Sequence, residues 1–283
     1  MKILSFKYFS IALASVWLII FTLFPNFFIL IVSFLKRDEI NFIKPVATLD
    51  NFKTLADPIF LSIFIKSLYL SSVTTLLCLI LSYPFVLITS KFTENMKKIL
   101  LLLVIIPFWT SSLIRTYALI TILKANGVIN SLLISLHIID APMNILYTDV
   151  AVFIGLTYTL LPFMIIPLFV SVDNIDYQLI EAAYDLGAGK IRTLYSIIIP
   201  LTLPGIIAGC VLVFLPSLGL FYIPDILGGS KSMLIGNLIK NQFLITMNWP
   251  LGSSISILLN LVLGILLFIY YKSLRRLNKI VTD

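Results

Sequence analysis

Residues Glu181-Ala182-Ala183-Tyr184-Asp185-Leu186-Gly187, followed by Ile197-Ile198-Ile199-Pro200, decide how the whole chain is interpreted. They form a spaced pattern of Glu-Ala-Ala, three residues, Gly, nine residues, Ile, one residue and Ile-Pro. The pattern lies in a connection between two long apolar stretches. Its small residues, glycine and proline predict a structured hairpin and not a plain linker.

Capping residues within this segment predict two short helices. Asp176 is an N-cap candidate for a helix from Tyr177 to Leu186, because its side chain can accept from the unpaired amides of the first turn. Gly187-Ala188-Gly189 tolerates a left-handed C-cap, and a second helix from Lys190 can run towards Pro200.

The side chains of the first helix suit a docking surface. Ala182 and Ala183 are small, so a partner's groove can come close to the helix backbone. Tyr184 and Leu186 offer apolar anchors for the partner. Glu181 and Asp185 offer charges that can fix the partner's position along the helix. An ordinary amphipathic pair of cytoplasmic helices is the alternative, and the spacing favours the docking interpretation.

The pattern resembles the EAA loop of binding-protein-dependent ABC importers, the cytoplasmic hairpin through which a membrane subunit engages its ATPase. Only Ile199 departs from that motif, which has Leu at this position. The resemblance implies a type I ABC importer permease (MetI-like) fold with cytoplasmic coupling helices. It also implies a coupling role for eight residues: Glu181, Ala182, Ala183, Tyr184, Asp185, Leu186, Gly187 and Pro200.

Composition predicts an all-α integral membrane protein. Hydrophobic residues make up 60% of the chain, only 12% of residues are charged, and the mean hydropathy is +1.09. We expect one transmembrane domain over residues 1–283, with the EAA coupling loop at 173–200. Six transmembrane helices of roughly 20 residues or more are expected, at about 8–35, 67–90, 99–123, 150–172, 203–222 and 252–271.

The net charge of +7 is distributed as in a membrane protein and not as in a nucleic-acid-binding one. Basic residues gather before the first span, between the second and third, and after the last: Lys2, Lys7, Lys91, Lys97, Lys98, Lys272, Arg275, Arg276 and Lys279. The positive-inside rule makes these segments cytoplasmic. Both termini and the loop around Glu181 are then cytoplasmic, and the longer external connections at 36–66, 124–149 and 225–249 have room for short interfacial helices.

Catalytic chemistry is not expected on this chain. Leu186 to Lys190 resembles a phosphate-binding loop, but Tyr184 and Ile191 stand where that loop needs Gly and Ser or Thr. His137 has no metal-ligating neighbours in the sequence, and Cys78 and Cys210 fall inside expected spans. We therefore expect no metal, no disulfide and no cofactor here, with ATP and Mg used by a partner ATPase.

Several residues are candidates for a translocation pathway. Arg115 is a charge well inside an expected span, where it either organises helix packing or borders the route. Asp149 and Asp225 lie at external span ends, where each is a cation attractor or a solvated helix end. Aromatic side chains complete the set, since they suit an alkylammonium but also concentrate at membrane interfaces: Trp109, Tyr117, Phe221 and Tyr222.

A narrower resemblance extends over nearly the whole chain. The stretches 106–110, 112–115, 197–210, 219–222 and 248–250 look like those of the permease subunits of spermidine/putrescine importers. This resemblance implies a polyamine permease in a bacterial inner membrane, with a second, homologous permease and an ATPase dimer at the EAA loop. It also implies a periplasmic polyamine-binding protein at the external face.

Two other hypotheses remain. The same architecture suits another small solute, such as an inorganic anion, for which Arg115 is a natural attractor. Alternatively, the chain is a secondary transporter driven by an ion gradient. The scarcity of intramembrane carboxylates for proton or sodium coupling counts against this last hypothesis.

Overall fold

The computed structural model describes residues 2–38, 40, 42–229 and 232–282, with the side chains of 2–7, 10 and 273–282 outside the described part. The basic side chains of Lys2, Lys7, Arg275, Arg276 and Lys279 therefore lie outside it. The chain divides into two compact units, one of residues 1–62 and 238–264, the other of 63–237 and 265–283. The single domain expected over residues 1–283 stays a prediction.

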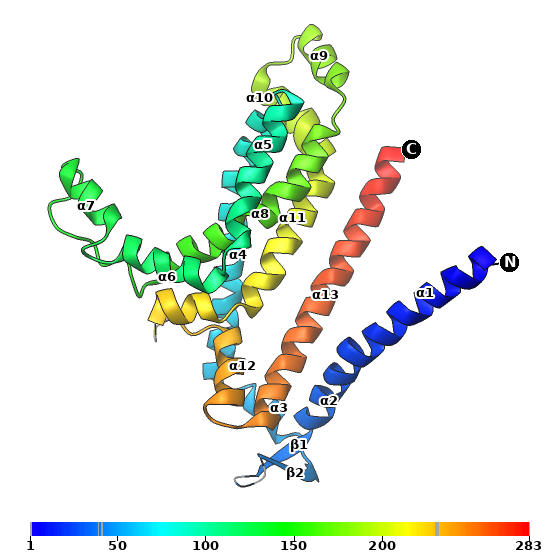
Figure 1. Ribbon diagram of the computed structural model, residues 1–283, viewed down its shortest axis with the longest axis vertical. Coiled ribbons are helices and arrows are strands. Elements are labelled where there is room, and N and C mark those ends of the chain that lie inside the picture. Colours follow the sequence, from blue (N-terminus) through cyan, green and yellow to red (C-terminus); the bar gives the residue numbers. More distant parts are fainter. Residues whose placement is uncertain (1, 39, 41, 230–231, 283) are drawn as a thin grey trace. The chain divides into compact units, whose positions relative to one another are not determined.

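The first unit is built from the N-terminal helices and a small hairpin (Figure 1). Its elements are α1 (Lys2–Leu18), a π-helical turn η1 (Ile19–Leu23), α2 (Phe24–Ser33), β1 (Leu35–Asp38), β2 (Phe42–Ala47), α3 (Asp50–Thr54) and parts of α12 (Ile235–Leu244) and α13 (Trp249–Thr282). Asn51 Nδ2 donates to the Ser33 and Leu35 carbonyls at 3.0 and 2.8 Å, and Ser254 Oγ donates to the Ser33 carbonyl at 3.1 Å. These bonds join the end of α2 to α3 and α13.

A short two-stranded hairpin accompanies the helices of the first unit. β1 and β2 pair in antiparallel fashion, with Arg37 opposite Ile43. The physical reason lies in β2, where Pro45 lacks an amide donor and Ile43 and Val46 are β-branched, so the segment favours extended backbone. Phe42 stacks on Trp249 with ring centroids 5.7 Å apart, which attaches the hairpin to the start of α13.

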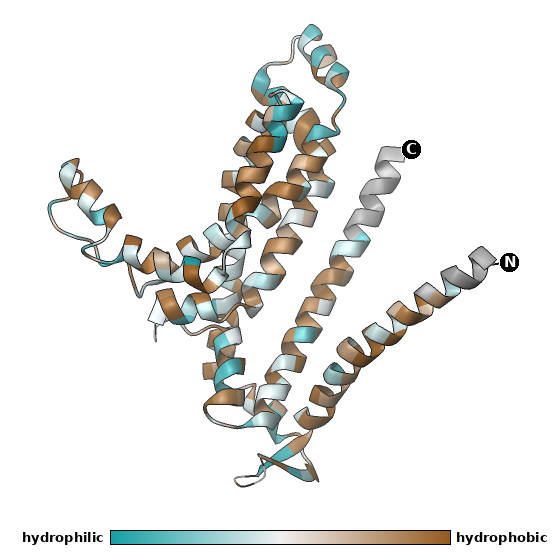
Figure 2. Ribbon diagram, in the orientation of Figure 1, coloured by the Kyte–Doolittle hydropathy of each residue, from teal (hydrophilic) through white to brown (hydrophobic). Residues whose placement is uncertain are grey.

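The second unit is a helical bundle that ends in a small helical hairpin (Figure 1). Its elements are most of α4 (Pro58–Thr89), α5 (Glu94–Ile105), the 3₁₀ turn η2 (Ile106–Trp109), α6 (Ser112–Leu123), α7 (Val128–Ser135), α8 (Asp149–Asp173), α9 (Tyr177–Asp185), α10 (Lys190–Thr193), the π-helical turn η3 (Leu194–Ile198), α11 (Ile199–Gly219) and the π-helical turn η4 (Pro224–Gly228). Apolar residues run along α8 and α11, and hydrophilic residues gather around α9 and α10 (Figure 2).

Two apolar clusters form the core of this second unit. One joins α4, α8 and α11 through buried side chains that include Cys78, Met164 and Val213. The other joins α4, α6, α8 and η4 around the buried Leu156 and Ile223. α8 contributes to both clusters, so it is the central helix of the unit.

Six described helical stretches are long and apolar enough to cross a membrane, as the sequence predicts. They are Ile11–Ser33, Pro58–Thr89, Ser112–Ser135, Asp149–Asp173, Lys190–Gly219 and Trp249–Lys272. The first, fourth and sixth agree with the expected spans to within three residues at each end, and the fifth begins at Lys190 and not at residue 203. The second begins at Pro58 and not at residue 67, which brings Lys66 inside a membrane-length helix.

The third expected span, 99–123, is not one continuous helix. α5 ends at Ile105, a 3₁₀ turn follows, and α6 starts at Ser112. Pro107 explains the break, because it has no amide to donate and its ring excludes the preceding helical turn. α5 has 12 residues and spans only about 18 Å. The membrane-length stretch Ser112–Ser135 lies after this break, and it consists of α6 and α7 with residues 124–127 between them.

Glycines permit the close packing of α8 against α11. A Cβ on Gly205 would lie 2.7 Å from the Pro167 carbonyl oxygen, and one on Gly209 would lie 2.5 Å from Met164 Sδ. Small residues at such crossings let helix backbones approach closely in membranes. The contact between these two helices therefore depends on the absence of side chains at positions 205 and 209.

We expect Gly205→Ala to destabilise the protein by about 1–3 kcal/mol, because the new methyl group meets the α8 backbone. Gly219→Ala is the matched control, since a Cβ at Gly219 on the same helix meets nothing within 4 Å. Thermal unfolding of the two variants in one detergent measures the difference. Equal unfolding temperatures for both variants would contradict the packing described above.

Candidate functional site

The first helix of the expected hairpin is present with its predicted cap. α9 spans Tyr177–Asp185, and Asp176 Oδ1 accepts a hydrogen bond from the amide of Gln178 at 3.0 Å. Asp176 thus satisfies one of the amides that the first helical turn leaves unpaired. The predicted N-cap is confirmed, and the helix ends one residue earlier than expected, with Leu186 at the C-cap.

The turn after α9 requires glycine at position 187. Gly187 has φ +80°, its amide donates to the Tyr184 carbonyl at 2.9 Å, and the amide of Ala188 donates to the Ala183 carbonyl at 2.9 Å. This pair of bonds is a Schellman motif, in which a residue in the left-handed region closes the helix. Gly189 has an ordinary φ of −75° at the N-cap of α10, so only Gly187 needs its conformational freedom.

The second helix of the hairpin continues into the membrane-length helix. α10, η3 and α11 follow one another from Lys190 to Gly219. The π-helical turn at Leu194–Ile198 was not expected from the sequence. It ends two residues before Pro200, whose missing amide leaves the preceding turn without one of its usual donors.

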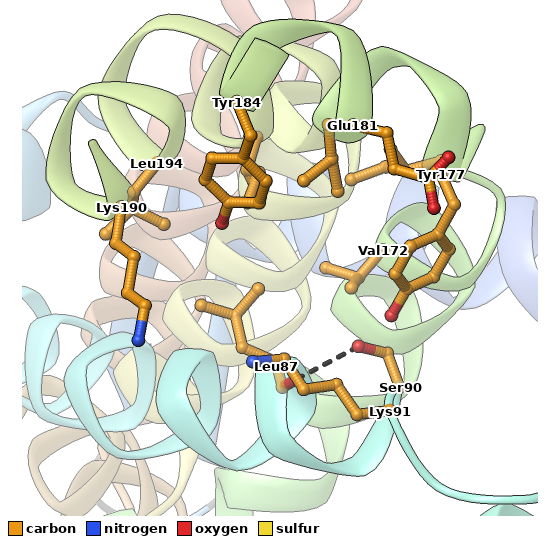
Figure 3. Close-up of a pocket in the computed structure, with 12 residues that line it drawn as sticks. Leu87, Ser90, Lys91, Val172, Tyr177, Glu181, Tyr184, Lys190 and Leu194 are labelled. Atoms are coloured by element: carbon orange, nitrogen blue, oxygen red, sulfur yellow. Dashed lines mark hydrogen bonds between the residues drawn. The ribbon is translucent and has the colours of Figure 1, made fainter. Parts of the chain in front are cut away.

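α9 has a hollow on each side. One is a cavity of about 580 Å³ shown in Figure 3, where Tyr177 and Tyr184 extend from α9 toward the end of α4. It is lined by Leu87, Ser90, Lys91, Val172, Ile175, Tyr177, Ile180, Glu181, Tyr184, Lys190, Leu194 and Ile198. The other, of about 350 Å³, is lined by Leu179, Ala182, Ala183, Leu186, Ala188, Arg192, Thr193, Ser196 and Ile197.

The expected docking residues are divided between these hollows. Glu181 and Tyr184 line the cavity beside α4 and α8, whereas Ala182, Ala183 and Leu186 line the smaller hollow. Ala183 is buried and Leu186 is 89% exposed. The eight residues therefore do not form a single surface, and their coupling role stays a prediction.

An ion pair fixes the base of the hairpin. Lys97 Nζ at the start of α5 lies 2.6 Å from Asp173 Oδ1 at the end of α8 and 2.9 Å from Glu94 Oε1. The Lys97 side chain is only 13% exposed. The hydrogen bond to Asp173, followed by that to Glu94, raises the pKa of Lys97 well above its usual value. The lysine therefore stays charged, and it joins α5 to the residue from which the hairpin departs.

Arg115 lies in a niche between η2, α6 and α8. Its Cζ atom is 4.7 Å from the centroid of the Phe108 ring and 5.8 Å from that of Tyr158. Trp109 at the end of η2 and Tyr117 on α6 are 81% and 60% exposed. The structure thus places three of the candidate pathway residues on or beside α6.

The two candidate acids are held by other side chains. Asp149 Oδ1 lies 3.1 Å from Lys66 Nζ and accepts from Ser232 Oγ at 2.5 Å. Asp225 accepts a hydrogen bond from the side-chain amide of Asn237. Both carboxylates have structural partners at the end of the unit opposite the hairpin, and their contact with a cargo stays a prediction.

The aromatic candidates at 221 and 222 reach α6. The rings of Phe221 and Tyr222 lie 6.2 Å apart, and the Tyr222 hydroxyl is 2.5 Å from Ser112 Oγ. Ser112 and Arg115 are one helical turn apart on α6, so Tyr222 contacts the same face of α6 that carries Arg115. The site for an alkylammonium at these rings and Asp225 stays a prediction.

Sequence reasoning missed the partners that hold these groups. Lys66 carries a signal, because it is a charge inside an apolar helix, but the expected span began one residue after it. Asp173 is the last residue of α8, Ser232 precedes α12 and Asn237 lies in α12, and nothing in their local sequence identifies their partners. The sequence indicates Lys97 only as part of a basic connection.

Known proteins resemble the chain over nearly its whole length. The "Spermidine/putrescine transport system permease protein PotB" of Salmonella typhimurium is 49% identical over 267 residues, which cover 94% of this chain and 93% of that protein. The protein of the same name from Haemophilus influenzae is 46% identical over 281 residues, 99% of this chain and 98% of that one. No protein-family model matches the chain.

A solved structure shares the fold. It is a bacterial alginate ABC transporter in complex with an alginate pentasaccharide-bound periplasmic protein, and one of its chains has a TM-score of 0.79 with this chain. The alignment covers 98% of this chain and 96% of that chain, at 18% sequence identity. At this identity the likeness concerns the fold alone.

We expect Lys97→Met to loosen the hairpin, because it removes the ion pair at the end of α8. Hydrogen–deuterium exchange of the amides in 176–190 should be faster by severalfold in this variant. Lys98→Met is the matched control, since Lys98 is exposed and the described part of the chain gives it no ion pair. Equal exchange in both variants would show that the ion pair does not hold the hairpin.

Proposed function

Because the chain belongs to the family of spermidine/putrescine transport system permease proteins, we propose that it is the membrane permease subunit of an ATP-driven importer of polyamines. The observation that carries this proposal is 46–49% identity over 94–99% of the chain to proteins with that name. The ABC importer permease fold expected from the sequence is confirmed by the likeness to the alginate transporter. The chain's part is transport and not catalysis.

The proposed complex contains further chains and lies in a bacterial inner membrane. It comprises a homologous second permease, an ATPase dimer that binds the hairpin and uses ATP and Mg, and a periplasmic polyamine-binding protein at the opposite face. Lys91 and Lys97 lie at the same end of the second unit as the hairpin, which supports a cytoplasmic hairpin by the positive-inside rule. The same rule places both termini in the cytoplasm.

The hairpin transmits motion because it continues directly into two core helices. α8 leads into α9 through residues 174–176, and α10 and η3 lead into α11 without a gap. The Schellman turn at Gly187 fixes the angle between the two arms of the hairpin. When the ATPase dimer closes on ATP, it displaces the hairpin. The hairpin then moves the α8–α11 pair, and the spans change between inward-facing and outward-facing states.

The ATPase binds the hairpin on the side of Ala182 and Leu186. Ala182 is exposed and small, Leu186 is 89% exposed, and the hollow beside them is open for an apolar side chain. An exposed leucine beside small residues suits the centre of an interface. Glu181 and Tyr184 line the opposite side of α9, where they face the ends of α4 and α8.

The proposal is tested by ATP-dependent uptake of labelled spermidine into vesicles that contain this chain, the second permease, the ATPase and the binding protein. Vesicles that lack only this chain should show no uptake, and unlabelled putrescine should compete. Competition by an inorganic anion in place of putrescine would favour the alternative cargo. Uptake driven by an ion gradient without the ATPase would contradict the importer mechanism.

We expect Gly187→Val to reduce spermidine uptake at least tenfold. Either the complex hydrolyses ATP without transport, or it fails to assemble. The left-handed conformation at φ +80° costs a residue with a Cβ about 1–2 kcal/mol, and more for a branched one. Gly189→Val is the matched control, because Gly189 has φ −75° and open space around its Cα. Normal uptake by Gly187→Val would show that the turn has no coupling role.

A further inference from the structure

The larger cavity beside α9 combines an apolar lining with a charged rim. Its apolar lining residues are buried or half-buried: Leu87, Val172, Ile175, Ile180, Leu194 and Ile198. Its exposed lining residues are charged or phenolic: Lys91, Tyr177, Glu181, Tyr184 and Lys190. Its volume of about 580 Å³ is that of a small-molecule site, for which roughly 300–1,000 Å³ is usual. The cavity therefore suits an amphiphile, with a hydrocarbon part inside and a polar part at the rim.

The positive charges of the rim are gathered toward one end of the cavity. Lys190 and Tyr184 lie at one end in Figure 3, whereas Glu181 and Tyr177 lie at the other. The side chain of Lys91 extends along the end of α4 toward the end with Lys190 (Figure 3). Neither lysine belongs to an ion pair among the residues that the structure describes. Two ammonium groups and a phenol hydroxyl all donate hydrogen bonds, so this end of the cavity suits an anion.

The cavity lies at the height of a membrane surface. Its lining residues surround the ends of three helical stretches that are long enough to cross a membrane, at Thr89, Asp173 and Lys190. Lipid headgroups occupy this level, immediately outside the hydrocarbon core of a bilayer. Basic pockets between membrane helices are typical binding sites for anionic headgroups. Height and charge therefore favour the same kind of occupant.

The cargo of the proposed importer does not match this cavity. A polyamine is a cation, and the lining carries two lysines against the single carboxylate of Glu181. A phosphate group is an anion that accepts hydrogen bonds from ammonium and phenol groups. A phosphate ester with an attached hydrocarbon chain matches both the basic end and the apolar lining.

We propose that the cavity binds the phosphate of an anionic phospholipid from the cytoplasmic leaflet. Lys91, Lys190 and Tyr184 surround the phosphate, and an acyl chain follows the apolar lining. The choice of leaflet rests on the proposed function, which makes the hairpin cytoplasmic. Tyr184 belongs to α9, Lys190 begins α10, and Lys91 follows α4. The bound lipid thus joins both arms of the hairpin to α4 and restrains the hairpin at the membrane surface.

Lipid binding is measured by native mass spectrometry of the purified complex, with phosphatidylglycerol added to the detergent. Lys91→Gln and Lys190→Gln should each weaken the binding of one lipid molecule about fivefold, which is the effect of one lysine near an anionic headgroup. Lys98→Gln is the matched control, because Lys98 is exposed near the same end of the second unit and does not line the cavity. Glu181→Gln should instead strengthen binding, because it removes a carboxylate that repels the phosphate.

A water-soluble competitor separates a lipid from a free phosphate ester. Glycerophosphoglycerol has the headgroup of phosphatidylglycerol without its acyl chains, so it should bind at least tenfold more weakly. Binding as tight as that of phosphatidylglycerol would assign the cavity to a soluble phosphate ester and overturn the lipid as its occupant.

Hydrogen–deuterium exchange tests the restraint on the hairpin without reference to the cargo. Phosphatidylglycerol should slow the exchange of the amides in 176–190 severalfold in the unmodified complex and leave their exchange in Lys91→Gln unchanged. This result in a complex that takes up no spermidine would support the lipid site and contradict the proposed cargo. The inference is overturned if Lys91→Gln and Lys190→Gln bind phosphatidylglycerol as tightly as Lys98→Gln does.

Discussion

The close contact between α8 and α11 is the interaction on which the rest of the second unit depends. α8 contributes to both apolar clusters, and α11 approaches it where Gly205 and Gly209 leave the backbone uncovered. Lipid tails are as apolar as these side chains, so exclusion of water does not hold two helices together inside a membrane. Dense packing between small residues provides the attraction instead. Because α8 and α11 also lead into the two arms of the hairpin, the same contact sets the position of that hairpin.

Much of this architecture is predictable because its causes are local in the sequence. Long apolar stretches predict membrane helices, and the cap at Asp176 and the left-handed turn at Gly187 follow from the chemistry of those two residues. The break at Pro107 is also a local effect, and it was missed because the apolar character continues through it. The β1–β2 hairpin was missed because a short polar connection gives only a weak strand signal.

The polar contacts were not predictable, since each joins residues far apart in the chain. Lys97 meets Asp173, Lys66 meets Asp149, and Tyr83 meets Thr202 at 2.9 Å between α4 and α11. Periodicity tells which side of a helix is apolar, but it does not tell which neighbour stands opposite a given polar group. For the same reason the sequence predicts the coupling residues as one set, whereas α9 presents them on two sides.

The π-helical turn η3 changes the register between the hairpin and the membrane. A π turn accommodates one residue more than an α-helical turn, and one residue corresponds to about 100° of rotation around a helix. A helical wheel drawn through Lys190–Gly219 as a regular α-helix therefore assigns the wrong azimuth to one of its halves. Because the wider turn holds the extra residue, removal of a single residue from Leu194–Ile198 would restore a regular α-helix and leave the hairpin arm aligned with the membrane-length helix. Chimeric permeases that exchange hairpins need to keep the π turn and its extra residue together, because one extra residue in a regular α-helix turns its two halves by about 100°.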